Sequence, residues 1–127
     1  MIWGIMAVIM LTLLCLKLVS RKLKWHKAER FLQKIHNPCG FLLLTVIVIH
    51  YVATLEVWST RSVMVIGSGI LTAVLVLIMT FGYSFRRKLK SRWILLHRLV
   101  ALFIVLLSIC HLSFYYVDFF TYKNTID

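Results

Sequence analysis

Four long apolar stretches, separated by short polar segments, constrain the fold of this chain most strongly. They cover residues 2–19, 38–57, 62–85 and 93–117. An α-helix rises 1.5 Å per residue, so about 20 apolar residues cross a hydrocarbon layer of about 30 Å. Hydrophobic residues make up 61% of the 127-residue chain. We therefore predict an all-α membrane protein, a bundle of four transmembrane helices that forms a single domain over residues 1–127.

The basic residues are concentrated in two of the segments that separate these stretches. Seven of the fifteen lie around the first junction and six around the third: Lys17, Arg21, Lys22, Lys24, Lys27, Arg30 and Lys34, then Arg86, Arg87, Lys88, Lys90, Arg92 and Arg98. Cytoplasmic loops carry an excess of Lys and Arg. We therefore expect a multi-pass protein of the cell membrane, with both basic segments cytoplasmic and both termini external. Topology and anionic lipid account for the net charge of +11, so nucleic-acid binding is not expected.

A short amphipathic segment is expected between Arg21 and Ile35, where the first two spans are joined. Its apolar residues fall on one side of a helix and its charged residues mostly on the other. We expect it to lie flat on the inner leaflet or, alternatively, to dock an acidic soluble partner. Asn37 is a good N-cap and Pro38 suits a first helical position, so the second span is expected to begin just after His36.

Two histidine pairs with the same spacing carry the functional prediction. His36 and His50 are separated by fourteen positions, and so are His97 and His111. On a helix this spacing is about 40° short of four full turns and about 21 Å along the axis. Both members of a pair therefore face the same way. The two spans run in the same direction, which puts His36 level with His97 and His50 level with His111.

Depth-matched imidazoles on two helices are what a haem clamped between the helices requires. Polar groups within a membrane are costly and indicate function by default. Gly40 and Ala101 lie four positions after the first histidine of each pair, where a bulky side chain would strike a porphyrin. We therefore predict a site for two haems, whose irons are bound by these four histidines.

The stretch Leu96-His97-Arg98-Leu99-Val100-Ala101, with the apolar run to Ile109-Cys110-His111, resembles the haem-bearing helices of the ferric reductase-like transmembrane domain. Ferric reductases and NADPH oxidases belong to that family. The stretch from His36-Asn37-Pro38-Cys39-Gly40 to Ile49-His50 is similar. The resemblance implies two b-type haems stacked across the bilayer, with His36 and His97 on the cytoplasmic haem and His50 and His111 on the outer haem. Electrons would pass from inside to outside.

Family members commonly have more spans and a flavin module, whereas this chain has four predicted spans and no dinucleotide-binding motif. It resembles a minimal cytochrome b core, an oxidoreductase or electron-transport subunit that needs a separate reductase. A cytoplasmic flavoprotein is the expected electron donor, with quinol as the second choice. A homo-oligomer or a larger complex is compatible with this prediction.

Haem propionates need partners at each face of the membrane. The candidates are Lys34, Arg92 and Arg98 inside, with Arg61, Tyr51, Tyr115 and Tyr116 outside. His26 is the alternative inner ligand, because the predicted helix start at Asn37–Pro38 puts His36 on a loop or kink. Cys15, Cys39 and Cys110 lack metal-type spacing and are expected to be small buried thiols.

Two other functional classes are alternatives for a chain with four spans. A small multidrug-type exporter would need a carboxylate in the middle of a span, but Glu56 lies near an outer end and no span carries a central Asp or Glu. A membrane anchor or assembly subunit of a larger complex, without a redox role of its own, remains the alternative function.

Overall fold

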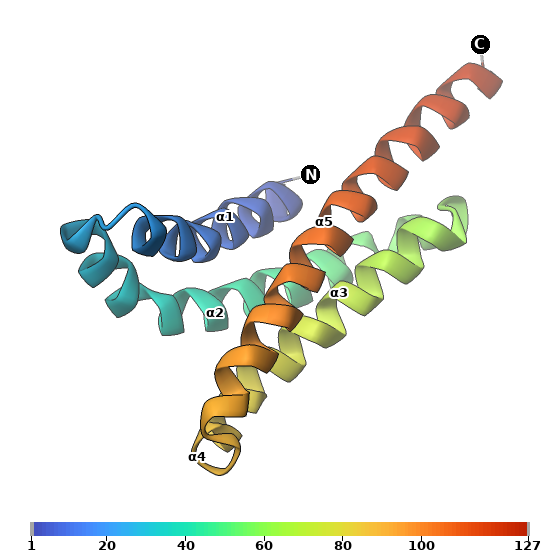
Figure 1. Cartoon of the computed structure of the whole chain (residues 1–127). Coiled ribbons are helices and arrows are strands. Elements are labelled where there is room, and N and C mark those ends of the chain that lie inside the picture. Colours follow the sequence, from blue (N-terminus) through green and yellow to red (C-terminus); the bar gives the residue numbers. More distant parts are fainter. Residues whose placement is uncertain (1, 127) are drawn as a thin grey trace. The chain divides into compact units, whose positions relative to one another are not determined.

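The computed structural model describes residues 2–126, all of them in helices and short turns (Figure 1). The four long helices are α1 (Ile2–Lys22), α2 (His26–Thr54), α3 (Val63–Gly82) and α5 (Ser91–Ile126). Three short elements, η1 (Leu55–Thr60), η2 (Tyr83–Phe85) and α4 (Arg86–Leu89), lie between them. Each long helix is long and apolar enough to cross a membrane. The predicted class, an all-α multi-pass membrane protein with four candidate spans, is confirmed.

Large apolar side chains are exposed along every long helix. Ile2 on α1, Phe41 on α2, Met64 on α3 and Phe103 on α5 are each more than half exposed. A water-soluble protein rarely exposes contiguous apolar surface of this extent. Hydrocarbon solvates such side chains without penalty, so this surface is suited to contact with lipid.

The second long helix begins earlier than the sequence pattern predicts. The expected start after His36 is wrong, because α2 starts at His26 and continues through Pro38. Proline removes one backbone donor and leaves the carbonyl of Lys34 without its usual partner, but the flanking hydrogen bonds can persist. In a membrane helix this local cost is smaller than that of a full break, which would leave more backbone groups unsatisfied. The amphipathic segment is therefore the first part of α2 rather than a separate element, and α2 bends along its course (Figure 1).

The chain divides into two compact units, one ending at Ala53 and the other beginning at Thr54. The first unit contains α1 and α2. The two helices are antiparallel, because Gly4 near the start of α1 lies beside His50 near the end of α2. The turn between them passes through Lys24, which has a φ of 53°.

The second unit is built on the closely packed pair α3 and α5. Contacts between these helices run in opposite order along the two sequences: Gly82 meets Trp93, and Gly69 meets His111. The pair is therefore antiparallel, and η2 and α4 form the connection. That connection ends at Lys90, whose φ of 47° and ψ of −121° are unusual for a residue with a side chain.

Candidate functional site

Each predicted histidine pair lies on one continuous helix. His36 and His50 are both on α2, and His97 and His111 are both on α5. All four side chains are half-buried. Fourteen residues of helix separate the members of each pair by about 21 Å along the axis. Because α2 and α5 belong to different units, the pairing of His36 with His97, and of His50 with His111, stays a prediction.

His111 has the best-defined surroundings of the four. Its Nδ1 atom lies 3.0 Å from the carbonyl oxygen of Val65 and 3.1 Å from the hydroxyl oxygen of Ser68, both on α3. A carbonyl can only accept, so Nδ1 must carry a proton. The Ser68 hydroxyl lies 2.7 Å from the carbonyl oxygen of Met64. It can donate there while it accepts from His111. In the neutral imidazole, Nε2 is then the nitrogen with the available lone pair.

Gly69 makes this approach possible. A Cβ atom at position 69 would lie 3.0 Å from Cε1 and 3.3 Å from Nδ1 of His111, closer than side chains normally pack. A Cβ atom at Gly67, two residues earlier, would meet no atom of the described residues within 4 Å. The absence of a side chain at position 69 therefore lets the imidazole reach the α3 backbone.

His97 lies against an aromatic neighbour on its own helix. The ring centroids of Trp93 and His97 are 5.6 Å apart, with an angle of 45° between the planes. The Trp93 ring in turn packs against the end of α3, where a Cβ atom at Gly82 would lie 3.1 Å from Cζ3. Trp93 thus contacts both the His97 ring and a second small residue of α3.

Gly4 of α1 faces His50 in the first unit. A Cβ atom at position 4 would lie 3.5 Å from Cε1 of His50, an ordinary contact distance. The surroundings of Gly40 are open, since a Cβ atom there meets nothing in the described part of the chain within 4 Å. On α5, the small residue Ala101 is half-buried and Arg98 is exposed.

One predicted propionate partner instead contacts an acidic side chain. Arg61 lies 3.8 Å from Asp118, and its guanidinium sits 4.9 Å from the centre of the Tyr115 ring. The same Asp118 oxygen lies 3.3 Å from the backbone nitrogen of Ser62, the N-cap residue of α3. Asp118 therefore ties α5 to the beginning of α3, where the helix dipole favours a negative charge.

The remaining candidates are mostly exposed. Lys34, Arg92, Tyr51 and Tyr116 are exposed, as is His26 at the first position of α2. Of the cysteines only Cys39 is buried, whereas Cys15 is half-buried and Cys110 is exposed. Within residues 2–126, no three His, Cys, Asp or Glu side chains converge as a metal site would require.

The sequence does not identify Val65 and Ser68 as the α3 residues that hold His111, because a valine and a serine are ordinary on an apolar helix. The available signal was the small-residue run Gly67-Ser68-Gly69, because small residues let membrane helices approach closely. Comparisons of the chain with protein-family models, with curated proteins and with solved structures found no match.

Proposed function

We propose that this chain carries electrons across a membrane through two b-type haems, bound by His36 and His97 on one side and by His50 and His111 on the other. The contact between His111 and α3 is the observation on which the proposal depends. Histidines that bind a metal almost always donate their second ring nitrogen to a carbonyl, a carboxylate or water, and this bond fixes the ring and its tautomer. His111 donates Nδ1–H to Val65 and Ser68, which leaves the Nε2 lone pair available to an iron.

The residues around the inner histidines also fit a large planar ligand. The space around Gly40 and the small side chain of Ala101, each four residues beyond a predicted ligand, support this assignment. Arg98 is exposed one position after His97 and is our candidate partner for a propionate. Its planar, permanently charged guanidinium suits a carboxylate better than a lysine would.

In this proposal the chain's own residues bind the two haems, orient the histidine ligands and give the haems apolar surroundings. Bound haem would supply a one-electron iron couple at each histidine level. The apolar side chains along α2 and α5 would surround the haems, and the neutral form of imidazole is the one that ligates iron. Val65, Ser68 and Gly69 orient His111, and Trp93 orients His97.

The proposed direction of transfer follows from the placement of the basic segments. We place the segments around Lys24 and Lys88 on the cytoplasmic side, with both termini outside. The resemblance to the ferric reductase-like transmembrane domain supports an electron donor on the cytoplasmic side and an electron acceptor on the outer side. A cytoplasmic flavoprotein or another reductase would supply the electrons, because the chain carries no dinucleotide-binding motif.

A second candidate function is a membrane anchor or assembly subunit. The bond between His111 and Val65 also serves helix packing, because it satisfies a polar ring within the α3–α5 pair. In that case His111 would be structural, and its replacement would weaken the unit without removing a cofactor.

Vesicle electron transfer tests the proposal directly. Protein would be reconstituted into liposomes that enclose dithionite, and reduction of external ferricyanide would be followed by absorbance. We expect rates well above those of empty vesicles, a loss of rate in His97→Ala and His111→Ala, and no loss in the control His26→Ala. Ferricyanide reduction no faster than in empty vesicles, by protein shown to contain haem, would contradict the proposed function while leaving the cofactor assignment intact.

A further inference from the structure

The turn between α1 and α2 contains an apolar groove. Leu16, Val19 and Ser20 line it from α1, and Ala28, Phe31 and Leu32 line it from α2. Trp25 also lines it, and the groove has a volume of about 240 Å³. The groove lies wholly within the first unit, and neither of the two α2 histidines that we assign as ligands lines it.

The lining of the groove is suited to hydrocarbon. Its one hydroxyl belongs to Ser20, a residue only 3% exposed, and this hydroxyl donates to the carbonyl of Lys17 at a distance of 3.0 Å. A polar ligand would therefore find little to bind. A methylene group takes up about as much space as a water molecule, roughly 30 Å³, so the groove holds on the order of eight methylenes. That is a segment of one acyl chain.

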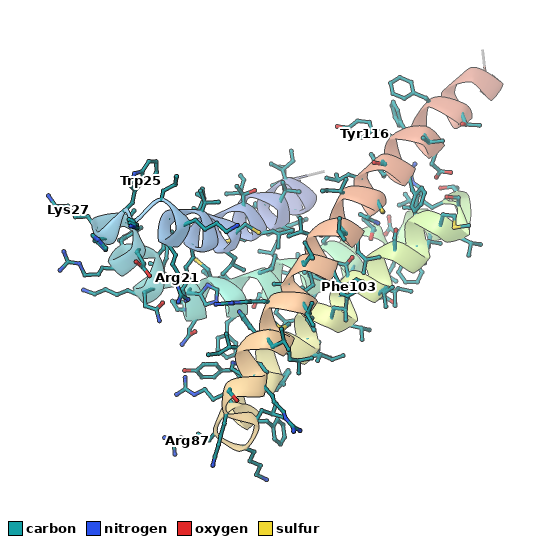
Figure 2. All side chains as sticks on the ribbon, in the orientation of Figure 1. Arg21, Trp25, Lys27, Arg87, Phe103 and Tyr116 are labelled. Atoms are coloured by element: carbon teal, nitrogen blue, oxygen red, sulfur yellow. The ribbon has the colours of Figure 1, made fainter. Side chains whose placement is uncertain are left out.

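Positive charge surrounds the groove. The side chains of Arg21, Lys22, Lys24, Lys27, Arg30 and Lys34 are all exposed. The one acidic residue between Leu16 and Lys34 is Glu29. Figure 2 shows Arg21, Trp25 and Lys27 gathered at this end of the first unit. An acyl-chain groove bordered by cations matches a ligand that has an apolar tail and an anionic head.

The position of the groove agrees with such a ligand. It lies beside the turn between two candidate spans, Ile2–Lys22 and His26–Thr60, and junctions between spans face the lipid headgroups. Trp25 is 61% exposed there, and tryptophan is enriched at membrane interfaces. An amphipathic helix is about 10 Å across, so a groove of about 240 Å³ would admit one of its side chains but not the helix. The dimensions therefore favour lipid over protein.

We propose that the groove between α1 and α2 is a binding site for an anionic phospholipid, whose acyl chain occupies the apolar slot and whose phosphate contacts Lys24 and Lys27. This site does not depend on haem. It makes the α1–α2 turn a selective lipid contact rather than a general membrane anchor.

Quenching of Trp25 fluorescence tests the site. The protein would keep Trp25 as its one tryptophan, through Trp3→Phe, Trp58→Phe and Trp93→Phe, in phosphatidylcholine nanodiscs. Phosphatidylglycerol or phosphatidylcholine with a brominated acyl chain would then be titrated in over the same range of mole fractions. We expect half-maximal quenching at a roughly 25-fold lower fraction of phosphatidylglycerol, because Lys24 and Lys27 each favour an anionic headgroup by about fivefold.

Two pairs of variants separate the contribution of the groove to the lipid preference from that of the charge. Ala28→Phe should fill the slot and abolish the preference, whereas Ala53→Phe at the far end of α2 should keep it. The double variant Lys24→Gln/Lys27→Gln should reduce the preference without blocking the groove, whereas Arg87→Gln/Lys88→Gln removes the same charge elsewhere and should not. Equal quenching of the parent protein by both lipids would overturn the proposal. In that event, a shift of Trp25 emission by poly-glutamate would assign the surface to an acidic protein.

Discussion

The Nδ1 atom of His111 lies 3.0 Å from the carbonyl oxygen of Val65, a residue 46 positions earlier in the chain. This contact joins α5 to α3 and fixes the proton of the imidazole on Nδ1. One bond thus does two things: it satisfies a polar ring within the helix pair, and it leaves Nε2 available to a metal.

Gly69→Val is expected to destabilise the second unit. The Cβ atom alone would lie 3.0 Å from Cε1 of His111, so the ring must move away from Val65. Overpacking of this kind costs about 1–3 kcal/mol. Thermal unfolding in detergent would measure the loss. Gly67→Val is the matched control, because a Cβ atom there meets no described atom within 4 Å. Equal unfolding temperatures for the two variants would contradict the packing of His111 on α3.

Gly82→Ala is expected to destabilise the protein through Trp93. The backbone of Gly82 has a φ of −58° and a ψ of −25°, which alanine adopts without strain. The new methyl group, however, would lie 3.1 Å from Cζ3 and 3.2 Å from Cη2 of Trp93. We expect a loss of about 1–2 kcal/mol in the free energy of unfolding.

Phenylalanine lacks those two ring atoms, so the double variant Gly82→Ala/Trp93→Phe should recover part of the loss. A double-mutant cycle of the unfolding free energies would measure the coupling. Additive effects of the two substitutions would show that Trp93 does not pack on Gly82.

Asp118→Asn is expected to weaken the link between the end of α5 and the start of α3. The carboxylate contacts both Arg61 and the backbone nitrogen of Ser62. Partly exposed ion pairs contribute about 1 kcal/mol or less, and salt screens them. The difference in unfolding temperature between wild type and variant should therefore shrink at high ionic strength. Glu56→Gln, which removes another negative charge from the same unit, should have a smaller effect. A difference that grows with added salt would contradict the ion pair.

Lys90→Gly is expected to stabilise the turn before α5. A φ of 47° with a ψ of −121° suits glycine and strains a residue with a Cβ atom. We expect a gain of about 1 kcal/mol, whereas Lys88→Gly, which removes the same charge within α4, should cost about 1 kcal/mol. Thermal unfolding of the two variants side by side would reveal opposite signs. A loss of stability in both would mean that Lys90 does not adopt a positive φ.

Much of the fold could be predicted because its cause is local. Hydropathy along the chain gives four apolar stretches, and backbone hydrogen bonding in lipid makes each one a helix. The ends of the helices were harder to predict, because local capping signals compete with the need to satisfy backbone groups in lipid. Asn37 and Pro38 have the residue types of a helix start, yet α2 continues through both.

Less of the candidate site than of the fold could be predicted, because its contacts join different helices. The spacing of His97 and His111 is visible in the sequence, and both residues lie on one helix as predicted. The partners of His111 are not visible, because Val65 and Ser68 belong to another helix and meet it only when α3 and α5 pack. The ion pair between Arg61 and Asp118 was missed for the same reason.

Haem content per chain is the decisive measurement for the proposed histidine ligands. The purified protein would be assayed by its dithionite-reduced minus oxidised spectrum and by pyridine haemochrome, for wild type and for His50→Ala, His97→Ala and the control His26→Ala. We predict two b-type haems per chain in the wild type and in His26→Ala, falling towards one in each ligand variant. A colourless protein that does not take up added haemin would contradict haem ligation by these histidines.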